Sequence, residues 1–244
     1  MLKLFKVMIG LLLLPVCVVV SRVLWGLLQA AARTESAVFL PLPALALFSG
    51  FVLWLAAFML FPRPVRSYIL AHELTHALWG LLMGASIARI RVKEDRGSVV
   101  LSKTNFLITL APYFFPLYTV LLIGIYYLLM LFYPVERFHL LWLGLVGMTW
   151  GFHLTFTVCA LLQRQSDIRD QGRLFSYAVI YLANVLGICA WVVLVSDATA
   201  AEAAALGLAA GETVWQWLLV AGHWARQALR DTGWGAGLSR AMPG

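Results

Sequence analysis

The sequence is poor in charge. Only 12% of its 244 residues are Asp, Glu, Lys or Arg, whereas about a quarter are charged in an ordinary soluble domain. Acidic residues are the scarcest, with 11 against 18 Lys and Arg, so the formal net charge is +7. Because 62% of the residues are hydrophobic and fall into long runs, this composition excludes an ordinary soluble domain and indicates a polytopic membrane protein. The positive charge is then typical of cytoplasmic loops, and no nucleic-acid partner is expected.

Cysteine is also scarce. Cys17, Cys159 and Cys189 lie in apolar runs without metal-ligand spacing, so we expect them to be small hydrophobic side chains. The chain has no internal repeat and no low-complexity segment except the Ala-rich stretch 198–210. Without an inverted repeat or paired broken helices, the sequence argues against a small-solute transporter.

Six long apolar runs are present. They predict transmembrane helices at 7–30, 39–61, 68–85, 106–133, 140–162 and 174–196. For 68–85, a segment that only dips into the membrane is the alternative to a full crossing. Each run is close to or longer than the ~20 residues that cross the hydrocarbon layer. The first run follows Lys3 and Lys6, as in a signal peptide, but it lacks a small-x-small cleavage site before Arg22, so we expect an anchor. The fold class predicted is an all-α polytopic membrane protein with about six transmembrane helices.

Two loops carry most of the charge. Residues 86–105 hold five basic side chains against two acidic ones, and residues 163–173 hold three arginines against two aspartates. Two predicted spans separate these loops, so both lie on one face of the membrane. Their basic bias makes that face cytoplasmic.

Two segments outside the apolar runs carry local order. Ile90 and Val92 alternate with basic residues, and a turn at 94–97 is followed by a second extended stretch, which predicts a small cytoplasmic β-hairpin. The tail 211–230 is amphipathic and contains Trp and Arg, which predicts an interfacial helix. A seventh span at 203–222 is the alternative interpretation.

The chemistry centres on the stretch "YILAHELTHALWG" at 68–80. Helix positions four apart lie about 40° apart on one face, so His72 and His76 can direct nitrogens at one ion. Glu73 lies beside that face and can take a proton from a metal-bound water, as the general base of metal-assisted hydrolysis does. It is the only acidic residue inside the predicted spans, and a charge there costs roughly 2.5–3.5 kcal/mol, so such residues are usually ligating, paired or functional. We therefore predict a Zn²⁺ site.

The third zinc ligand is open at this point. A catalytic zinc takes three protein ligands and keeps one open position. A histidine at the metzincin spacing is excluded by Leu82, and the acidic residues of the hairpin turn do not lie on a helix. His153 is one alternative, either as a ligand or as a polar side chain packed between helices. Asp167 and Asp170 are the others, and they reach the histidines only if segment 163–173 dips toward them.

This arrangement resembles the site-2 protease family of intramembrane zinc metalloproteases, in its shorter, divergent, peptidase-M50B-like branch. The shared features are a membrane helix with His-Glu-x-x-His, a following basic hairpin, two further spans and an aspartate that opens the next helix. They cover roughly residues 65–190. The resemblance implies that His72, His76 and a distal aspartate bind zinc and that Glu73 is the catalytic base.

The resemblance also bears on the choice of aspartate. The divergent branch carries Ser-Asp, which favours Asp167 in "QSDIRDQG", while Asp170, with Gly172 two residues later, remains the alternative. The Asn-Pro stretch that helps to hold substrate in the family is missing here. Thr75 stands where Gly is common, and a threonine is tolerated there because it can hydrogen-bond within its own helix.

The expected organisation has three parts: N-terminal transmembrane helices at 1–62, a metalloprotease-like membrane core at 63–196, and an Ala-rich linker with an amphipathic interfacial tail at 197–244. We expect a multi-pass protein of a bacterial inner (plasma) membrane that contacts lipid and acts on other membrane proteins. The predicted function is an intramembrane zinc metallopeptidase that hydrolyses peptide bonds in or near membrane-spanning segments. Because the Asn-Pro stretch is missing, a catalytically inactive membrane scaffold or regulator with the same fold is the alternative.

Overall fold

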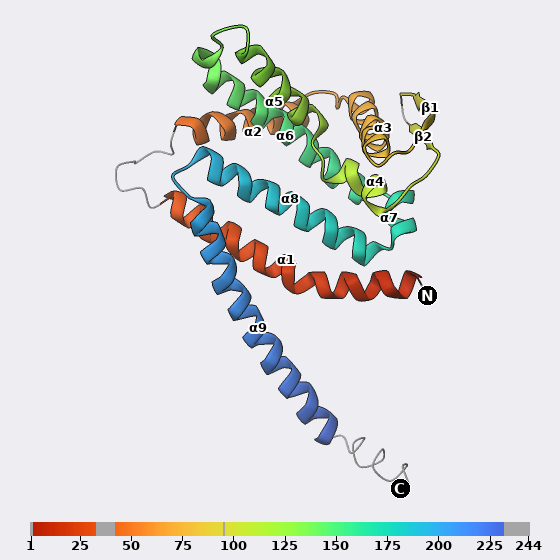
Figure 1. The fold of residues 1–244 in the computed structure, drawn as a ribbon, viewed down its shortest axis with the longest axis vertical. Helices are drawn as coiled ribbons and strands as arrows, with labels where there is room; N and C mark the ends of the chain where they lie inside the picture. Colours follow the sequence, from red (N-terminus) through yellow and green to blue (C-terminus); the bar gives the residue numbers. More distant parts are fainter. Residues whose placement is uncertain (1, 33–41, 95, 232–244) are drawn as a thin grey trace.

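The computed structural model describes residues 2–32, 42–94 and 96–231, most of which are helical (Figure 1). In chain order the elements are α1 (Leu2–Ala32), α2 (Leu42–Leu60), α3 (Val65–Leu82), β1 (Ile87–Val92), β2 (Gly97–Leu101), α4 (Phe106–Leu110), η1 (Ala111–Tyr113), α5 (Leu117–Met130), η2 (Glu136–Phe138), α6 (His139–Leu161), α7 (Ser166–Gln171), α8 (Arg173–Val195) and α9 (Ala200–Asp231).

Among the described residues, five helices are long and apolar enough to cross a membrane. They are α1, α2, α6 with the short η2 turn before it, α8 and α9. A sixth candidate is the pair Phe106–Tyr113 and Leu117–Met130, which is bent by 81°. The fold is therefore helical with a small sheet, and its helices are consistent with the expected multi-pass membrane protein.

The set of candidate spans differs from the expected one at α3 and α9. The predicted span 68–85 is largely helical in α3, but α3 is not among the helices apolar enough to cross. The reason is the polar content of its sequence, which includes Arg66, Glu73 and two histidines. α9 passes the test instead, as a single helix that includes most of the Ala-rich stretch expected to be a linker.

Two prolines break the predicted span 106–133. Proline has no N–H, and its ring clashes with the carbonyl four residues earlier. α4 accordingly ends at Leu110, and the chain passes through η1, which contains Pro112, before α5 begins after Pro116. The carbonyl of Tyr113 in η1 accepts a hydrogen bond of 2.9 Å from Asn184 Nδ2 of α8. The break is thus a sharp bend that is hydrogen-bonded to α8.

Two helix pairs form most of the body. α1 lies along α8, and α2 lies along α6 (Figure 1). α2 and α6 approach so closely that a Cβ atom on Gly50 would overlap the carbonyl oxygen of Gly144, and one on Gly147 would overlap that of Leu47. Small residues of this kind let membrane helices pack backbone against backbone, where lipid provides no hydrophobic drive for association.

A compact core cluster joins the break to the ends of α6, α7 and α8. Its buried members are Leu110, Tyr113, Ala160, Ile168, Phe175 and Ile180. Because α7 has only six residues, it is too short to be stable as an isolated helix. Its place in the fold therefore depends on such tertiary contacts.

The predicted β-hairpin is confirmed. β1 and β2 are antiparallel, Ile90 pairs with Val99, and the N–H of Lys93 donates to the carbonyl of Arg96 at 2.8 Å across the turn. The hairpin, α7 and the start of α1 lie at the same end of the bundle (Figure 1). The two basic loops of the sequence are therefore together, as expected from the two spans between them.

α9 leaves the body of the molecule. Its first turns pack on α1, where Leu206 lies against Gly26, and its second half projects away (Figure 1). The guanidinium of Arg22 on α1 lies 5.3 Å from the ring centre of Trp217. The tail expected as a separate interfacial helix is thus the second half of this longer helix.

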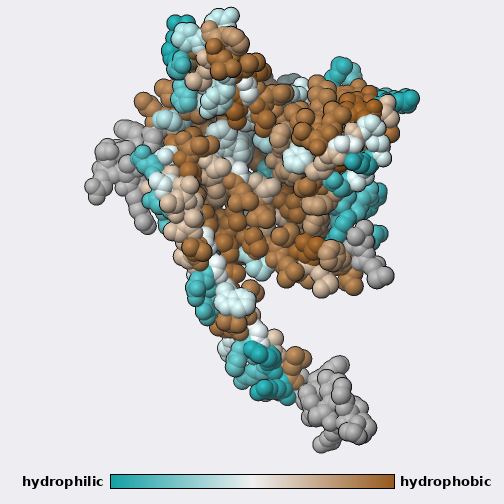
Figure 2. All heavy atoms as spheres, viewed as in Figure 1, coloured by the Kyte–Doolittle hydropathy of each residue, from teal (hydrophilic) through white to brown (hydrophobic). Residues whose placement is uncertain are grey.

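Apolar side chains cover much of the body, and polar side chains gather toward its ends and along the far part of α9 (Figure 2). Large hydrophobic side chains such as Leu12, Leu53 and Leu194 are mostly exposed. An apolar exterior between polar ends is the distribution expected of an integral multi-pass membrane protein.

Candidate metal centre

α3 supplies the histidine pair and the buried acid. His72 and His76 lie one turn apart on the helix face that lines a cavity of about 750 Å³, and Glu73 lines the same cavity. Glu73 is buried, with 7% of its surface exposed. Thr75 is fully buried, and its hydroxyl donates to the carbonyl of Ala71 at 2.7 Å, which confirms that this threonine is accommodated within its own helix.

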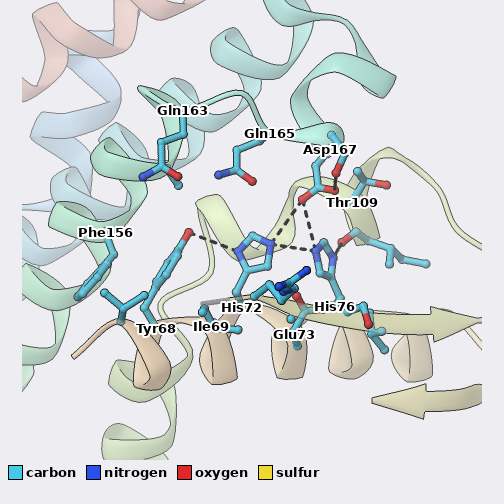
Figure 3. Close-up of a pocket in the computed structure, with 18 of the residues that line it drawn as sticks. Tyr68, Ile69, His72, Glu73, His76, Thr109, Phe156, Gln163, Gln165 and Asp167 are labelled. Atoms are coloured by element: carbon cyan, nitrogen blue, oxygen red, sulfur yellow. Dashed lines mark hydrogen bonds and ion pairs between the residues drawn. The ribbon is translucent and has the colours of Figure 1, made fainter. Parts of the chain in front are cut away.

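Asp167 of α7 completes a triangle with the two histidines (Figure 3). The Nε2 atoms of His72 and His76 are 3.2 Å apart. Oδ2 of Asp167 lies 3.4 Å from Nε2 of His72 and 3.5 Å from Nε2 of His76. Three ligand atoms of different residues thus converge on one point, and the group could hold a metal ion.

The ring of His76 is oriented by a backbone carbonyl. Its Nδ1 lies 2.8 Å from the carbonyl oxygen of Ile108 in α4. A carbonyl only accepts, so the proton of the neutral ring lies on Nδ1 and the lone pair of Nε2 points into the triangle. In an uninterrupted helix this carbonyl would accept the N–H of residue 112, which is Pro112 and has none. The proline break therefore leaves the Ile108 carbonyl available to the histidine.

His72 is held by aromatic neighbours. Its Nδ1 lies 3.4 Å from the hydroxyl of Tyr68, one turn earlier on α3. Its ring stands edge-on to Tyr113, with centroids 5.2 Å apart and an interplanar angle of 87°. These contacts leave Nε2 directed toward Asp167.

Asp167 is half-buried and well supported. The hydroxyl of Tyr113, itself completely buried, donates to Oδ2 at 3.0 Å. Burial raises the pKa of this carboxyl, but hydrogen bonds and charge from His72 and His76 in their protonated form, without a metal ion, outweigh burial and hold the pKa below its usual range. The carboxylate is therefore ionised at neutral pH, which is the form that binds a metal.

Glu73 lies under the hairpin. A Cβ atom on Gly97 would lie 2.5 Å from Cγ of Glu73 and 2.6 Å from its Oε1, so any larger residue here would have to displace the Glu73 side chain. All five residues of β2 line the cavity. The first strand residue after the turn is thus in direct contact with the buried carboxylate.

The wall opposite α3 is made by the α6–α7 connection. Gln163 and Gln165 direct their amide groups into the cavity (Figure 3). At one end of the cavity, Tyr68 stacks on Phe156 with ring centroids 4.8 Å apart. Thr109 lies at the other end, beyond His76 (Figure 3). The group that could hold a metal thus lies between an aromatic end and a hydroxyl end of the cavity.

The two alternative third ligands lie elsewhere. The side chain of Asp170 is 66% exposed, and its Oδ1 lies 3.7 Å from Nε of Arg169. His153 on α6 is buried behind α3, where it borders a second cavity of about 20 Å³ next to His72 and Tyr118. Its Nε2 has no hydrogen-bond partner among the described residues. Neither side chain belongs to the convergent group.

No family model matches the chain, and neither a curated protein nor a solved structure matches it. The metal centre has to be interpreted from its own geometry.

Several residues that shape the centre were not predicted from the sequence. Pro112 did carry a signal, because a proline four residues after Ile108 frees that carbonyl, but the sequence does not say which side chain uses it. Gly97 was expected only as a turn residue. Tyr113 and its contacts with Asp167 and His72 had no local signal at all.

Proposed function

We propose that this protein is an intramembrane zinc metallopeptidase of the site-2 protease type, which hydrolyses peptide bonds in or near membrane-spanning segments of other proteins. The single observation that carries the proposal is the triangle of His72, His76 and Asp167 beside Glu73. Two histidines, one carboxylate and a free neighbouring acid are the donor set of a hydrolytic zinc site.

The dimensions of the triangle support zinc. Ligand atoms about 2.0–2.2 Å from a tetrahedral ion are about 3.3–3.6 Å apart. The observed separations of 3.2, 3.4 and 3.5 Å match one face of such a tetrahedron. An ion held by these three groups would keep a fourth coordination position for water or substrate, as hydrolysis requires. When bound, zinc polarises the substrate carbonyl and lowers the pKa of a coordinated water to about 7.

Three residues around the metal-binding group have the other expected roles: proton acceptor and orientation of the ligands. Glu73 follows His72 in the chain, lines the cavity and is not one of the three convergent groups, so it is available to accept a proton from the attacking water. Its low exposure keeps bulk water away from the carboxylate. Ile108 and Tyr113 fix the orientation of the ligands, as outer partners do in other metal sites.

The cavity suits an extended peptide. A helix hides its peptide bonds, so a membrane-spanning substrate has to unwind before cleavage. β2 pairs with β1 on one edge, and its other edge can accept a peptide by strand addition. Gln163 and Gln165 face β2 across the cavity and offer amide donors and acceptors to a peptide backbone. They provide polar contacts in a chain that lacks the family's Asn-Pro stretch.

Metal content is the first test. Detergent-purified wild type is compared by mass spectrometry with His76→Ala, Asp167→Ala and Asp170→Ala. We expect one zinc per wild-type chain, lost in His76→Ala and Asp167→Ala and kept in Asp170→Ala, which serves as the matched control. Zinc retained in Asp167→Ala would contradict this ligand set.

Cleavage is the second test. Membranes of cells that make either wild type or Glu73→Gln are searched by mass spectrometry for new protein N-termini. We expect termini in or next to membrane-spanning segments with the wild type only, while both proteins contain equal zinc. Identical termini in both samples would overturn the peptidase and favour a zinc-binding scaffold or regulator.

A further inference from the structure

We infer that Gln171 is a positioning residue for the metal centre: through Lys6 of α1 and Thr109 of α4, it holds α7 so that Asp167 stays beside the two histidines. The inference rests on the metal site of the proposed function and adds to it the element that keeps the site assembled.

Gln171 lies on the face of α7 that carries the ligand. Asp167 and Gln171 are four residues apart, so their side chains are neighbours on a helix. Gly172 directly follows α7, and its φ of +93° turns the chain sharply into α8. A six-residue helix that ends in such an elbow is not rigid by itself. Side-chain contacts therefore decide where Asp167 points.

The amide of Gln171 joins three elements. Nζ of Lys6 donates to its Oε1 at 2.5 Å, and its Nε2 donates to Oγ1 of Thr109 at 3.3 Å. The ammonium can only donate, so it fixes which end of the amide faces it and leaves the NH₂ group for Thr109. The hydroxyl of Thr109 in turn donates to the carbonyl of Asn105 at 2.8 Å, so its oxygen can accept from Gln171 and from the hydroxyl of Thr104, which lies 3.2 Å away.

This series of hydrogen bonds ends in α4, next to the residue that orients His76. Thr109 follows Ile108, whose carbonyl orients His76. One amide thus ties the helix that carries Asp167 to the short helix that orients His76. Its loss would loosen two of the three ligands together.

α1 is a firm support for this contact. A Cβ atom on Gly10 would lie 2.9 Å from the backbone nitrogen of Phe175, so α1 packs directly on the first turn of α8. Farther along, the hydroxyl of Ser21 lies 2.8 Å from that of Tyr181. Since α1 packs along α8, Lys6 reaches Gln171 from a helix outside α7.

The test measures the dissociation constant for Zn²⁺ of the full chain in detergent, by competition with a chelator. The variants are Gln171→Ala, Lys6→Met and Lys6→Arg, and Lys3→Met is the matched control, because Lys3 is exposed on the same first turns of α1. The thermal midpoint of each metal-free protein is recorded beside it.

Gln171→Ala and Lys6→Met should each weaken zinc binding about tenfold, the lower end of the effect of losing an outer partner. Lys6→Arg should restore wild-type affinity, and Lys3→Met should not change it. The double variant that combines Gln171→Ala with Lys6→Met should bind zinc no more weakly than the weaker-binding single variant. Both substitutions break the same series of hydrogen bonds.

Each contrary outcome is informative. Wild-type affinity in Gln171→Ala, or a lower metal-free midpoint without a change in affinity, would overturn the positioning role while leaving the proposed function intact. Absence of zinc binding by the wild type would overturn the proposed function, and this inference with it.

Discussion

One carboxylate oxygen contacts three of the side chains that form the candidate metal centre. Oδ2 of Asp167 lies within 3.5 Å of both histidine Nε2 atoms and accepts a hydrogen bond from Tyr113 at 3.0 Å. The tyrosine is completely buried, so its hydroxyl has no solvent to exchange with. A neutral donor on a ligand oxygen fixes the orientation of the carboxylate without competing for the ion's charge.

Tyr113→Phe removes this donor and keeps the ring against His72. We expect zinc affinity to fall about tenfold, with the helical content unchanged, because Asp167 can then rotate away from the histidines. Chelator competition on detergent-purified protein measures the effect. Tyr126→Phe is the control, since its hydroxyl is 3.5 Å from His139 on the far side of the bundle. Equal affinity in the two variants would show that the hydroxyl does not position Asp167.

The individual residues differed in how far the sequence could predict them. His72, Glu73 and His76 follow from spacing on one helix, which is local information. Asp167 was favoured through a resemblance rather than derived, and the structure brings it to the histidines while Asp170 stays exposed. Contacts across the fold, such as the one from Tyr113 to Asp167, depend on packing that no short segment contains.

Among the elements, the broken helix formed by α4, η1 and α5 matters most for the site. A continuous helix would satisfy its own carbonyls and leave none for a neighbour. The two prolines interrupt that pattern, and the carbonyls of Ile108 and Tyr113 are used by His76 and by Asn184 instead. The bend of 81° is therefore tied to the orientation of His76 in the candidate metal centre.

Pro112→Ala tests that connection. Alanine restores an N–H that can compete for the Ile108 carbonyl, and it removes a helix-breaking residue that costs about 3 kcal/mol in a helix interior. We expect weaker zinc binding, about tenfold, even though the local helix becomes more favourable. Zinc titration together with circular dichroism measures both effects. Pro116→Ala is the control, because its position does not involve that carbonyl, and equal losses in the two variants would contradict this account.

The elements also show where sequence patterns are reliable. Alternation predicted the hairpin, and apolar runs predicted α1, α2, α6 and α8. The same approach counted α3 among the spans, with a dip into the membrane as the alternative, although its polar residues keep it out of that class. It divided α9 into a linker and a tail, and α9 as a candidate span agrees better with the alternative of a seventh span at 203–222. Hydrophobicity measures a preference for lipid, and α3 instead lies beside a hairpin and a polar cavity.

At the scale of the whole molecule, charge is unevenly distributed along the bundle. The end that holds the hairpin, α7 and the start of α1 carries the two basic loops and Lys6. Residues of the hairpin and of α7 at that end line the cavity that contains the candidate metal-binding group. Basic loops remain on the cytoplasmic side of a membrane. A cavity at that end would receive its water from the cytoplasm.

Cysteine labelling tests this orientation. In a background without the three native cysteines, Lys93→Cys marks the hairpin and Glu136→Cys marks the turn before α6. We expect a membrane-impermeant maleimide to label Glu136→Cys in intact cells and Lys93→Cys only in inverted vesicles, because the positive-inside rule fixes the basic end. Labelling in the reverse pattern would show that the cavity faces the opposite side.

The wide separation of the ligands along the chain has a consequence for biosynthesis. His76 lies in α3, while Asp167 lies in α7, after both α5 and α6. A nascent chain that has produced only the His-Glu-x-x-His helix has two of the three potential ligands. It still lacks Asp167. The complete group of three potential ligands can therefore form only after α7 has been made, which follows the synthesis of α5 and α6.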